Sequence, residues 1–124
     1  VLDGCDECLG SYQSDDFNIS SIDIYSSHFY SEDYTRMDRD AQRAKDINKP
    51  YIVGEYSTHF SEDFLKHIEN NNNILGSFFW SLYDLNHDHD DSFTIKYSES
   101  YNNDIIKLSN HFRRLQNLSQ QNWI

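Results

Sequence analysis

The chain has 124 residues, of which 37% are hydrophobic and 15% aromatic, and it carries a formal net charge of −11 with a pI near 4.7. This length and composition fit one ordinary domain with a packed core. The acidic charge argues against nucleic acid and anionic membrane surfaces as partners, because both require clustered Lys and Arg, whereas a neutral ligand is compatible with it.

The two ends of the chain say little about targeting. No apolar run reaches the roughly 18 residues that a membrane span needs. The chain begins at residues 1–4 without an initiator Met, in a stretch that reads as the end of a buried strand, so we expect the N-terminus to be truncated or processed. The triplets that begin at Asn18 and Asn117 would fit a secreted glycoprotein, although a chain rich in Asn and Ser also produces them by chance.

Strand and helix patterns alternate from the N-terminus onward. Residues 1–3 end a strand, and residues 4–21 form a long polar connection. Residues 22–25 are predicted as a short strand, whose exit is the segment 26–30. No linker rich in Pro, Gly or Ser interrupts the chain, so one continuous domain is expected.

The first helix is predicted to begin after Ser31, whose hydroxyl could cap the free amides, with Glu32 and Asp33 in its first turn. It should run to about Asn48, before the Lys49-Pro50 stop. Its apolar stripe consists of Met37, Ala41 and Ala44. The later predicted elements are a strand over 51–55, a helix capped by Ser61 with Phe64, Leu65 and Ile68 on one face, a turn over 70–73, a strand over 74–81, an acidic loop over 83–91, an extended segment over 93–97 and a helix over 102–118.

Two groups of residues could bind metal. Cys5 and Cys8 form one Cys-x-x-Cys, which could be a redox pair, half of a zinc site, or a pair of loop cysteines with or without a local disulfide. The His and Asp residues of segment 86–91 could also be ligands, but they lack the Gly of a calcium loop and the spacing of zinc proteases. We expect loop cysteines in the first case and a solvated acidic loop in the second, and His59 reads as a rim residue.

Strands that alternate with helices predict an α/β fold with a parallel sheet, and both doubly wound sheets and eight-stranded barrels have this pattern. Polar and aromatic residues stand at or just past the strand ends: His28, Tyr30, Glu55 and Trp80. Four such groups at one rim favour a barrel mouth, because barrel enzymes keep their chemistry at the carboxyl ends of the strands. A carboxylate beside an aromatic ring suggests a carbohydrate ligand.

Four segments carry a resemblance to a known family: residues 22–30 (IDIYSSHFY), 52–56 (IVGEY), 76–82 (GSFFWSL) and 91–97 (DSFTIKY). In order and spacing they resemble strands six, seven and eight of family 5 glycoside hydrolases, most like fungal-type endo-β-1,4-mannanases. The resemblance covers nearly the whole chain. It implies the C-terminal half of a (β/α)8 TIM barrel, from about strand 5 to strand 8, with residues 1–124 as one partial catalytic domain.

By this resemblance Glu55 is the catalytic nucleophile, and Trp80 is the aromatic floor under the reacting sugar. His28 and Tyr30 match a His-x-Tyr after strand six, in which the Tyr hydrogen-bonds the nucleophile and the His lines the cleft. Retaining hydrolysis also needs an acid/base carboxyl group about 5 Å from the nucleophile. The family supplies it from an Asn-Glu pair that ends strand four, and this sequence contains no Asn-Glu.

The sequence therefore predicts part of a secreted retaining glycoside hydrolase, similar to mannan endo-1,4-β-mannosidase, acting on β-mannan or a related β-glucan without cofactor or metal. These residues alone are predicted to be inactive, because a complete barrel takes about 250 residues and the general acid is missing. The alternative is a non-catalytic sugar-binding or degenerate half-barrel that associates through its open strand edges. A phosphate-binding half-barrel is disfavoured by the scarcity of Gly at the last two core strands.

Overall fold

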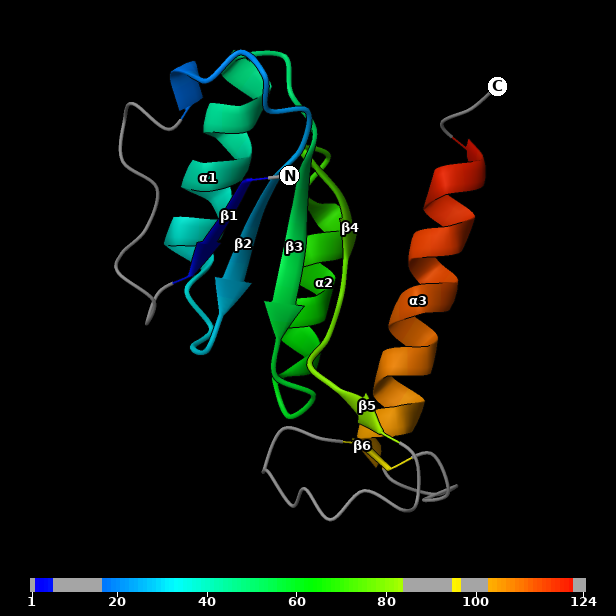
Figure 1. The fold of residues 1–124 in the computed structure, drawn as a ribbon. Coiled ribbons are helices and arrows are strands. Elements are labelled where there is room, and N and C mark those ends of the chain that lie inside the picture. The colour runs from blue at the N-terminus through cyan, green and yellow to red at the C-terminus, as the bar shows by residue number, and fades with distance from the viewer. Residues whose placement is uncertain (1, 6–16, 84–94, 97–102, 122–124) are drawn as a thin grey trace.

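The computed structural model describes residues 2–5, 17–83, 95–96 and 103–121, and Figure 1 shows how they are arranged. The elements in chain order are β1 (Leu2–Cys5), β2 (Tyr25–Phe29), α1 (Tyr34–Asp46), β3 (Tyr51–Tyr56), α2 (Glu62–Asn70), β4 (Ile74–Ser77), β5 (Leu82–Tyr83), β6 (Ile95–Lys96) and α3 (Asn103–Gln121).

The first four strands form one parallel sheet in the order β1-β2-β3-β4. All four strands point the same way, so their carboxyl ends lie at one edge, at the bottom of Figure 1. α1 and α2 connect successive strands and lie against the same face of the sheet (Figure 1). The strand order is sequential and contains no reversal of the kind that defines a doubly wound sheet. The predicted half-barrel remains a prediction.

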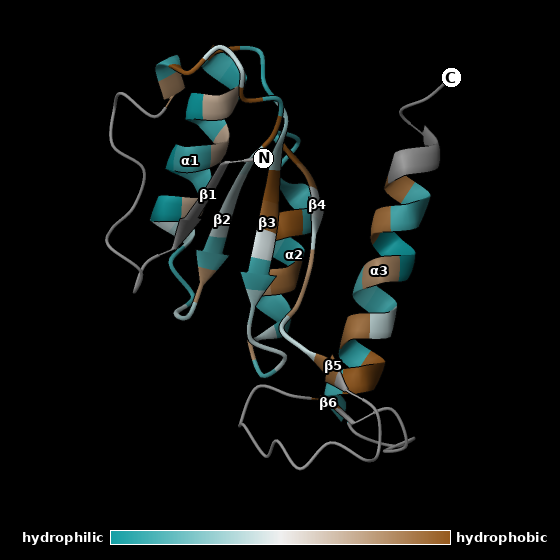
Figure 2. Ribbon diagram, viewed as in Figure 1, coloured by the Kyte–Doolittle hydropathy of each residue, from teal (hydrophilic) through white to brown (hydrophobic). Residues whose placement is uncertain are grey.

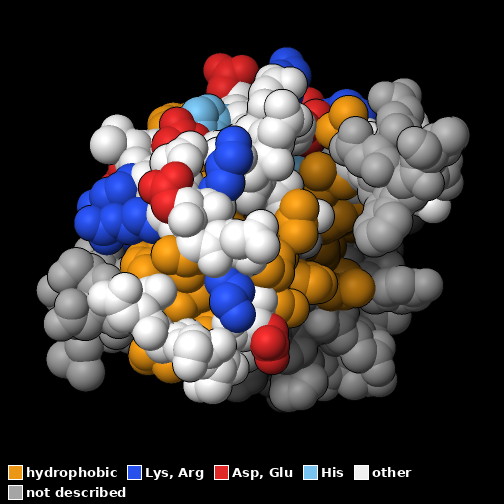
Figure 3. All heavy atoms as spheres, turned by 90° about the horizontal axis from the view of Figure 1, so that it is seen from above, with side chains coloured by type: hydrophobic (Ala, Val, Ile, Leu, Met, Phe, Trp, Pro, Cys, Tyr) orange, Lys and Arg blue, Asp and Glu red, His pale blue; other side chains and the backbone are white. Residues whose placement is uncertain are grey.

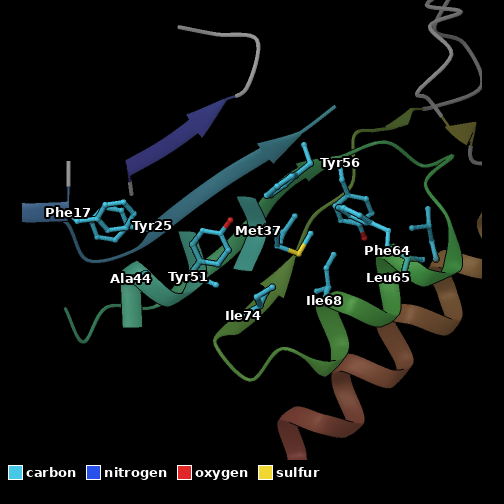
Figure 4. Close-up of a cluster of buried hydrophobic side chains, with 14 of the residues drawn as sticks. Phe17, Tyr25, Met37, Ala44, Tyr51, Tyr56, Phe64, Leu65, Ile68 and Ile74 are labelled. Atoms are coloured by element: carbon cyan, nitrogen blue, oxygen red, sulfur yellow. The ribbon is translucent and has the colours of Figure 1, made fainter. Parts of the chain in front are cut away.

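Phe64 of α2 lies at the centre of an aromatic cluster between the sheet and the helices (Figure 4). Its ring centroid is 4.8 Å from that of Phe60, 5.7 Å from that of Tyr56 and 6.0 Å from that of Phe29. The predicted apolar faces of both helices are confirmed as buried: Met37, Ala41 and Ala44 in α1, and Phe64, Leu65 and Ile68 in α2. Each large apolar side chain buried in this way contributes about 1.5–3 kcal/mol, which fixes the helices against the sheet.

The prediction of a strand over 22–25 is wrong, because the strand is Tyr25–Phe29. Its ladder to β3 begins only where Tyr25 meets Tyr51, so the partner strand decides where pairing starts. The predicted exit segment is therefore mostly strand, and His28 lies within β2. Ile22 instead packs as a partly buried residue at the margin of the core.

The predicted cap of the first helix is also wrong. Asp33 is the N-cap of α1, with its Oδ1 accepting from the Arg36 amide at 2.9 Å. α1 ends at Asp46, and Asn48 then adopts a φ of 57°, a left-handed conformation that Asn tolerates well in a helix-ending turn. The prediction for the second helix is confirmed, because Ser61 is the N-cap of α2 and accepts from the Phe64 amide at 3.1 Å.

The last core strand is shorter than predicted. β4 ends at Ser77, and the chain then crosses to a separate two-stranded sheet in which β5 pairs with β6. Of the extended segment predicted over 93–97, the structure describes residues 95–96, and these are a strand. The closing helix predicted over 102–118 is found as α3.

Hydrophobic and charged side chains separate on the surface. β3 is hydrophobic at its start and hydrophilic at its end (Figure 2). Seen from the end at which the strands begin, hydrophobic side chains gather in the lower half of the view, and most charged side chains lie in the upper half (Figure 3). The exposed large hydrophobic residues include Leu75, Phe78, Trp80 and Leu82 around β4 and β5. Within the described ranges, every helix is too short or too polar to span a membrane.

Candidate active site

A β-bulge at Gly54 sets the direction of Glu55. Val53 pairs with Ser27 and Glu55 pairs with His28, so Gly54 is the extra residue between these two pairs. In a regular strand, Glu55 would share the face of Val53, which is fully buried. The extra residue reverses the alternation, so that Glu55 comes beside His28 on the face of the sheet opposite α1 and α2.

The side chains of β2 leave little room for a side chain at this bulge. A Cβ atom at position 54 would fall on the Oγ of Ser26 and would lie 3.2 and 3.3 Å from Cδ2 and Nε2 of His28. A side chain at position 54 would therefore force the Ser26 side chain to move and would press on the His28 ring. The sequence held a signal for this feature, since Gly54 interrupts a strand of otherwise larger residues.

Glu55 is held by two side chains from β2 and the loop that follows it. Its Oε1 accepts a hydrogen bond from the Tyr30 hydroxyl, and its Oε2 lies 3.3 Å from Nδ1 of His28. The side chains of Glu55 and His28 are 14% and 21% exposed. The structure thus brings together three of the four predicted site residues. Tyr30 and His28 orient the carboxylate of Glu55, which remains partly exposed to solvent. Such a group can act as a nucleophile or as a base.

Trp80 lies at the same edge of the sheet, after the end of β4. Its amide donates to the carbonyl of Tyr56 at 2.9 Å, and it forms an isolated bridge with Ser57. Its backbone therefore runs beside the residues directly after Glu55. Trp80 is 46% exposed, and its peptide bond to Ser81 is cis. An exposed indole at this position is available to stack on a ligand.

Glu32 joins the loop that carries Tyr30 to the loop that follows Glu55, a contact that the sequence did not predict. Its carboxylate accepts from the amide and the hydroxyl of Ser61, both at 2.6 Å, and from the Tyr34 hydroxyl at 3.0 Å. Burial raises the pKa of Glu32, but the hydrogen bonds from Ser61 and Tyr34 outweigh it, and the pKa lies below its ordinary value. An ionised Glu32 thus ties the start of α2 to the loop before α1.

α3 holds the other side of the loop after β3. The Lys107 ammonium donates to the carbonyl of Phe60 and to Asp104, both at 2.7 Å, and Nδ1 of His59 lies 2.7 Å from the other Asp104 oxygen. Burial raises the pKa of Asp104, but Lys107 and His59 lower it by more, so the pKa of Asp104 lies below its ordinary value. His59 is exposed and bonded to α3. Contacts between residues so far apart in sequence leave no local signal.

The structure does not describe all of the possible metal ligands, which are the two cysteines and the acidic segment 86–91. Cys8 and the acidic segment 86–91 lie outside the described residues. Within residues 2–5, 17–83, 95–96 and 103–121, no three or more His, Cys, Asp or Glu side chains are placed to hold a metal ion.

Comparisons with known proteins give no family. No family model matches the chain, and no curated protein matches it. Two features remain from which a function can be inferred: the four segments that resemble glycoside hydrolases, and the geometry at the carboxyl edge of the sheet.

Proposed function

We propose that this chain carries the nucleophile side of a retaining glycoside hydrolase of the endo-β-mannanase type, with Glu55 as the nucleophile. The observation that carries the proposal is the contact of the Glu55 carboxylate with Tyr30 and His28 at the carboxyl edge of a parallel sheet. The exposed indole of Trp80 at the same edge supports a sugar ligand. The substrate class is a β-1,4-linked mannan or a related glucan, and hydrolysis requires no cofactor.

Retaining hydrolysis needs a nucleophile and a general acid, and Glu55 is proposed as the nucleophile. Its carboxylate attacks the anomeric carbon, the bond from that carbon to the leaving oxygen breaks, and a carboxylic acid on the other side of the bond protonates that oxygen. Water then hydrolyses the glycosyl ester. Because the sequence holds no Asn-Glu pair, the acid is expected from residues beyond this sequence, and this chain alone should not hydrolyse mannan.

A substrate that needs no acid tests Glu55 directly. In 2,4-dinitrophenyl 2-deoxy-2-fluoro-β-glycosides of the manno and gluco series, dinitrophenolate leaves as a stable anion, and the fluorine slows hydrolysis of the ester. Incubation should release one dinitrophenolate per chain and raise the intact mass by one fluorosugar. Glu55→Gln should abolish both signals.

Asp63→Asn is the matched control, because Asp63 is an exposed carboxylate in the first turn of α2, and it should label like the wild type. Labelling that survives Glu55→Gln, or a folded wild-type chain that never labels, would contradict the proposal.

The second candidate is a non-catalytic sugar-binding module, and it is favoured by the missing Asn-Glu pair together with the exposed Trp80. This function predicts saturable binding of β-1,4-manno-oligosaccharides that Trp80→Ala abolishes, without any labelling of Glu55. Isothermal titration with the oligosaccharide separates the two candidates.

A further inference from the structure

We infer that Arg36 is a positioning residue for this site and acts through the backbone of His28. Arg36 lies in the first turn of α1, and its Nη1 donates to the carbonyl oxygen of His28 at 2.7 Å. The inference rests on the proposed role of Glu55, because its consequence is the placement of His28 and Tyr30 over that carboxylate.

The bond reaches β2 at the point where its pairing is irregular. The register between β2 and β3 shifts between Ser27 and His28, and a bulge locally disrupts the ladder that would otherwise fix a strand. His28 follows this shift directly, and Tyr30 comes two residues later. A side chain that binds the His28 carbonyl therefore replaces part of the constraint that the bulge removes.

Asp40 holds the guanidinium in place from the next turn of α1. Its side chain is 0% exposed, and it lies 3.5 Å from Nε of Arg36 and accepts from the Ser27 hydroxyl at 3.1 Å. The guanidinium also lies over the Phe29 ring, 4.8 Å from the centroid. α1 thus holds two consecutive residues of β2, one through its side chain and the next through its carbonyl.

Stability alone is a poor explanation for this arrangement. Desolvation of a buried ion pair offsets much of its attraction, and well-packed apolar residues in its place are often neutral or stabilising. The geometry instead serves orientation, because the planar guanidinium can contact a carboxylate and a carbonyl at the same time. A displacement of about 1 Å in a supporting group can cost about 100-fold in rate.

Arg39 offers a matched control on the same helix. Its Nε lies 3.2 Å from the other oxygen of Asp40, but its side chain is 43% exposed. In the described part of the chain it makes no hydrogen bond to β2. Arg39→Leu removes one positive charge beside Asp40 and leaves the bond to His28 intact, whereas Arg36→Leu removes both.

The test compares the rates at which these variants of the full chain are labelled by the 2-fluoroglycoside. Arg36→Leu should label at least about 10-fold more slowly than the wild type, while Arg39→Leu should stay within about twofold. A second readout needs no reaction: the ring signals of His28 in a proton–carbon NMR spectrum should shift in Arg36→Leu and stay in place in Arg39→Leu. Circular dichroism establishes that each variant is folded.

Arg36→Lys covers the case in which Arg36→Leu fails to fold. Lys keeps the charge beside Asp40, but its single nitrogen cannot occupy both the Nε position beside Asp40 and the Nη1 position at the His28 carbonyl. Labelling should therefore still fall, and the His28 signals should still move. A folded Arg36 variant with wild-type labelling and unmoved His28 signals would overturn the inference, as would equal effects in Arg39→Leu. A wild-type chain that does not label refutes the proposed function, and the His28 signals alone then decide the role of Arg36.

Discussion

Replacing Gly54 with Ala should destabilise the fold and displace Glu55. The new Cβ would overlap the Oγ of Ser26, which is nearly fully buried at 3% exposure, and would crowd the His28 ring at 3.2 and 3.3 Å. Overpacking of this kind costs about 1–3 kcal/mol. For a chain of this size, that corresponds to a fall in the melting temperature of about 3–5 °C per kcal/mol.

A double-mutant cycle assigns the cost to the predicted contact. Ser26→Ala removes the oxygen that the new Cβ would meet, so Gly54→Ala should cost less in that background than in the wild type. The coupling free energy should be about 0.5–3 kcal/mol in favour of the double variant. Urea unfolding followed by far-ultraviolet circular dichroism gives all four free energies of unfolding.

Two results would rule out a clash between the new Cβ and Ser26. The first is a Gly54→Ala variant as stable as the wild type, which would mean that the Ser26 and His28 side chains accommodate the new Cβ without cost. The second is a cost that is unchanged in the Ser26→Ala background, which would place the strain elsewhere.

Two further predictions concern pH and helix capping. Burial lowers the pKa of His111, so the unfolded chain takes up a proton at a higher pH than the folded chain. Stability should therefore fall as the pH drops below 6.5, the ordinary value for His, and His111→Gln should reduce that slope in urea titrations at several pH values. Ser61→Ala should cost about 1–2 kcal/mol, because it removes the hydroxyl that caps α2 and donates to Glu32, while the bond from the residue 61 amide to Glu32 remains. Ser31→Ala should cost less than about 0.5 kcal/mol, since Ser31 is exposed and caps no helix; equal costs for the two variants would contradict the capping assignment.

Residue spacing within a short segment was enough to predict some features of the helices and one strand. The apolar stripe of α1 and the Ser61 cap of α2 follow from spacing and from one hydroxyl at the right position. Residues 51–55 read as a strand because apolar residues stop at a carboxylate. The start of β2 could not be read in this way, since residues 22–25 have the same strand preference and only pairing with Tyr51 selects where the ladder begins.

The sequence predicted which residue types lie at the candidate site, but it did not predict the bulge and the contacts that hold them. The Tyr30 hydroxyl donates to Glu55, a bond that the resemblance implied, and His28 lies beside the same carboxylate, which it did not imply. The catalytic role of these residues stays a prediction. The bulge that directs Glu55 was missed, although a Gly inside a strand often marks one. The contacts of Arg36 and Glu32 depend on the relative placement of loops and helices, which no local pattern encodes.

Peptide mapping of the 2-fluoroglycoside adduct determines whether Glu55 is the nucleophile. After labelling and proteolysis, fragmentation spectra should place one fluorosugar per chain on Glu55, and prior addition of β-1,4-manno-oligosaccharide should slow its formation. An adduct spread over several carboxylates, or placed on another residue while Glu55 stays unmodified, would mean that Glu55 is not the nucleophile.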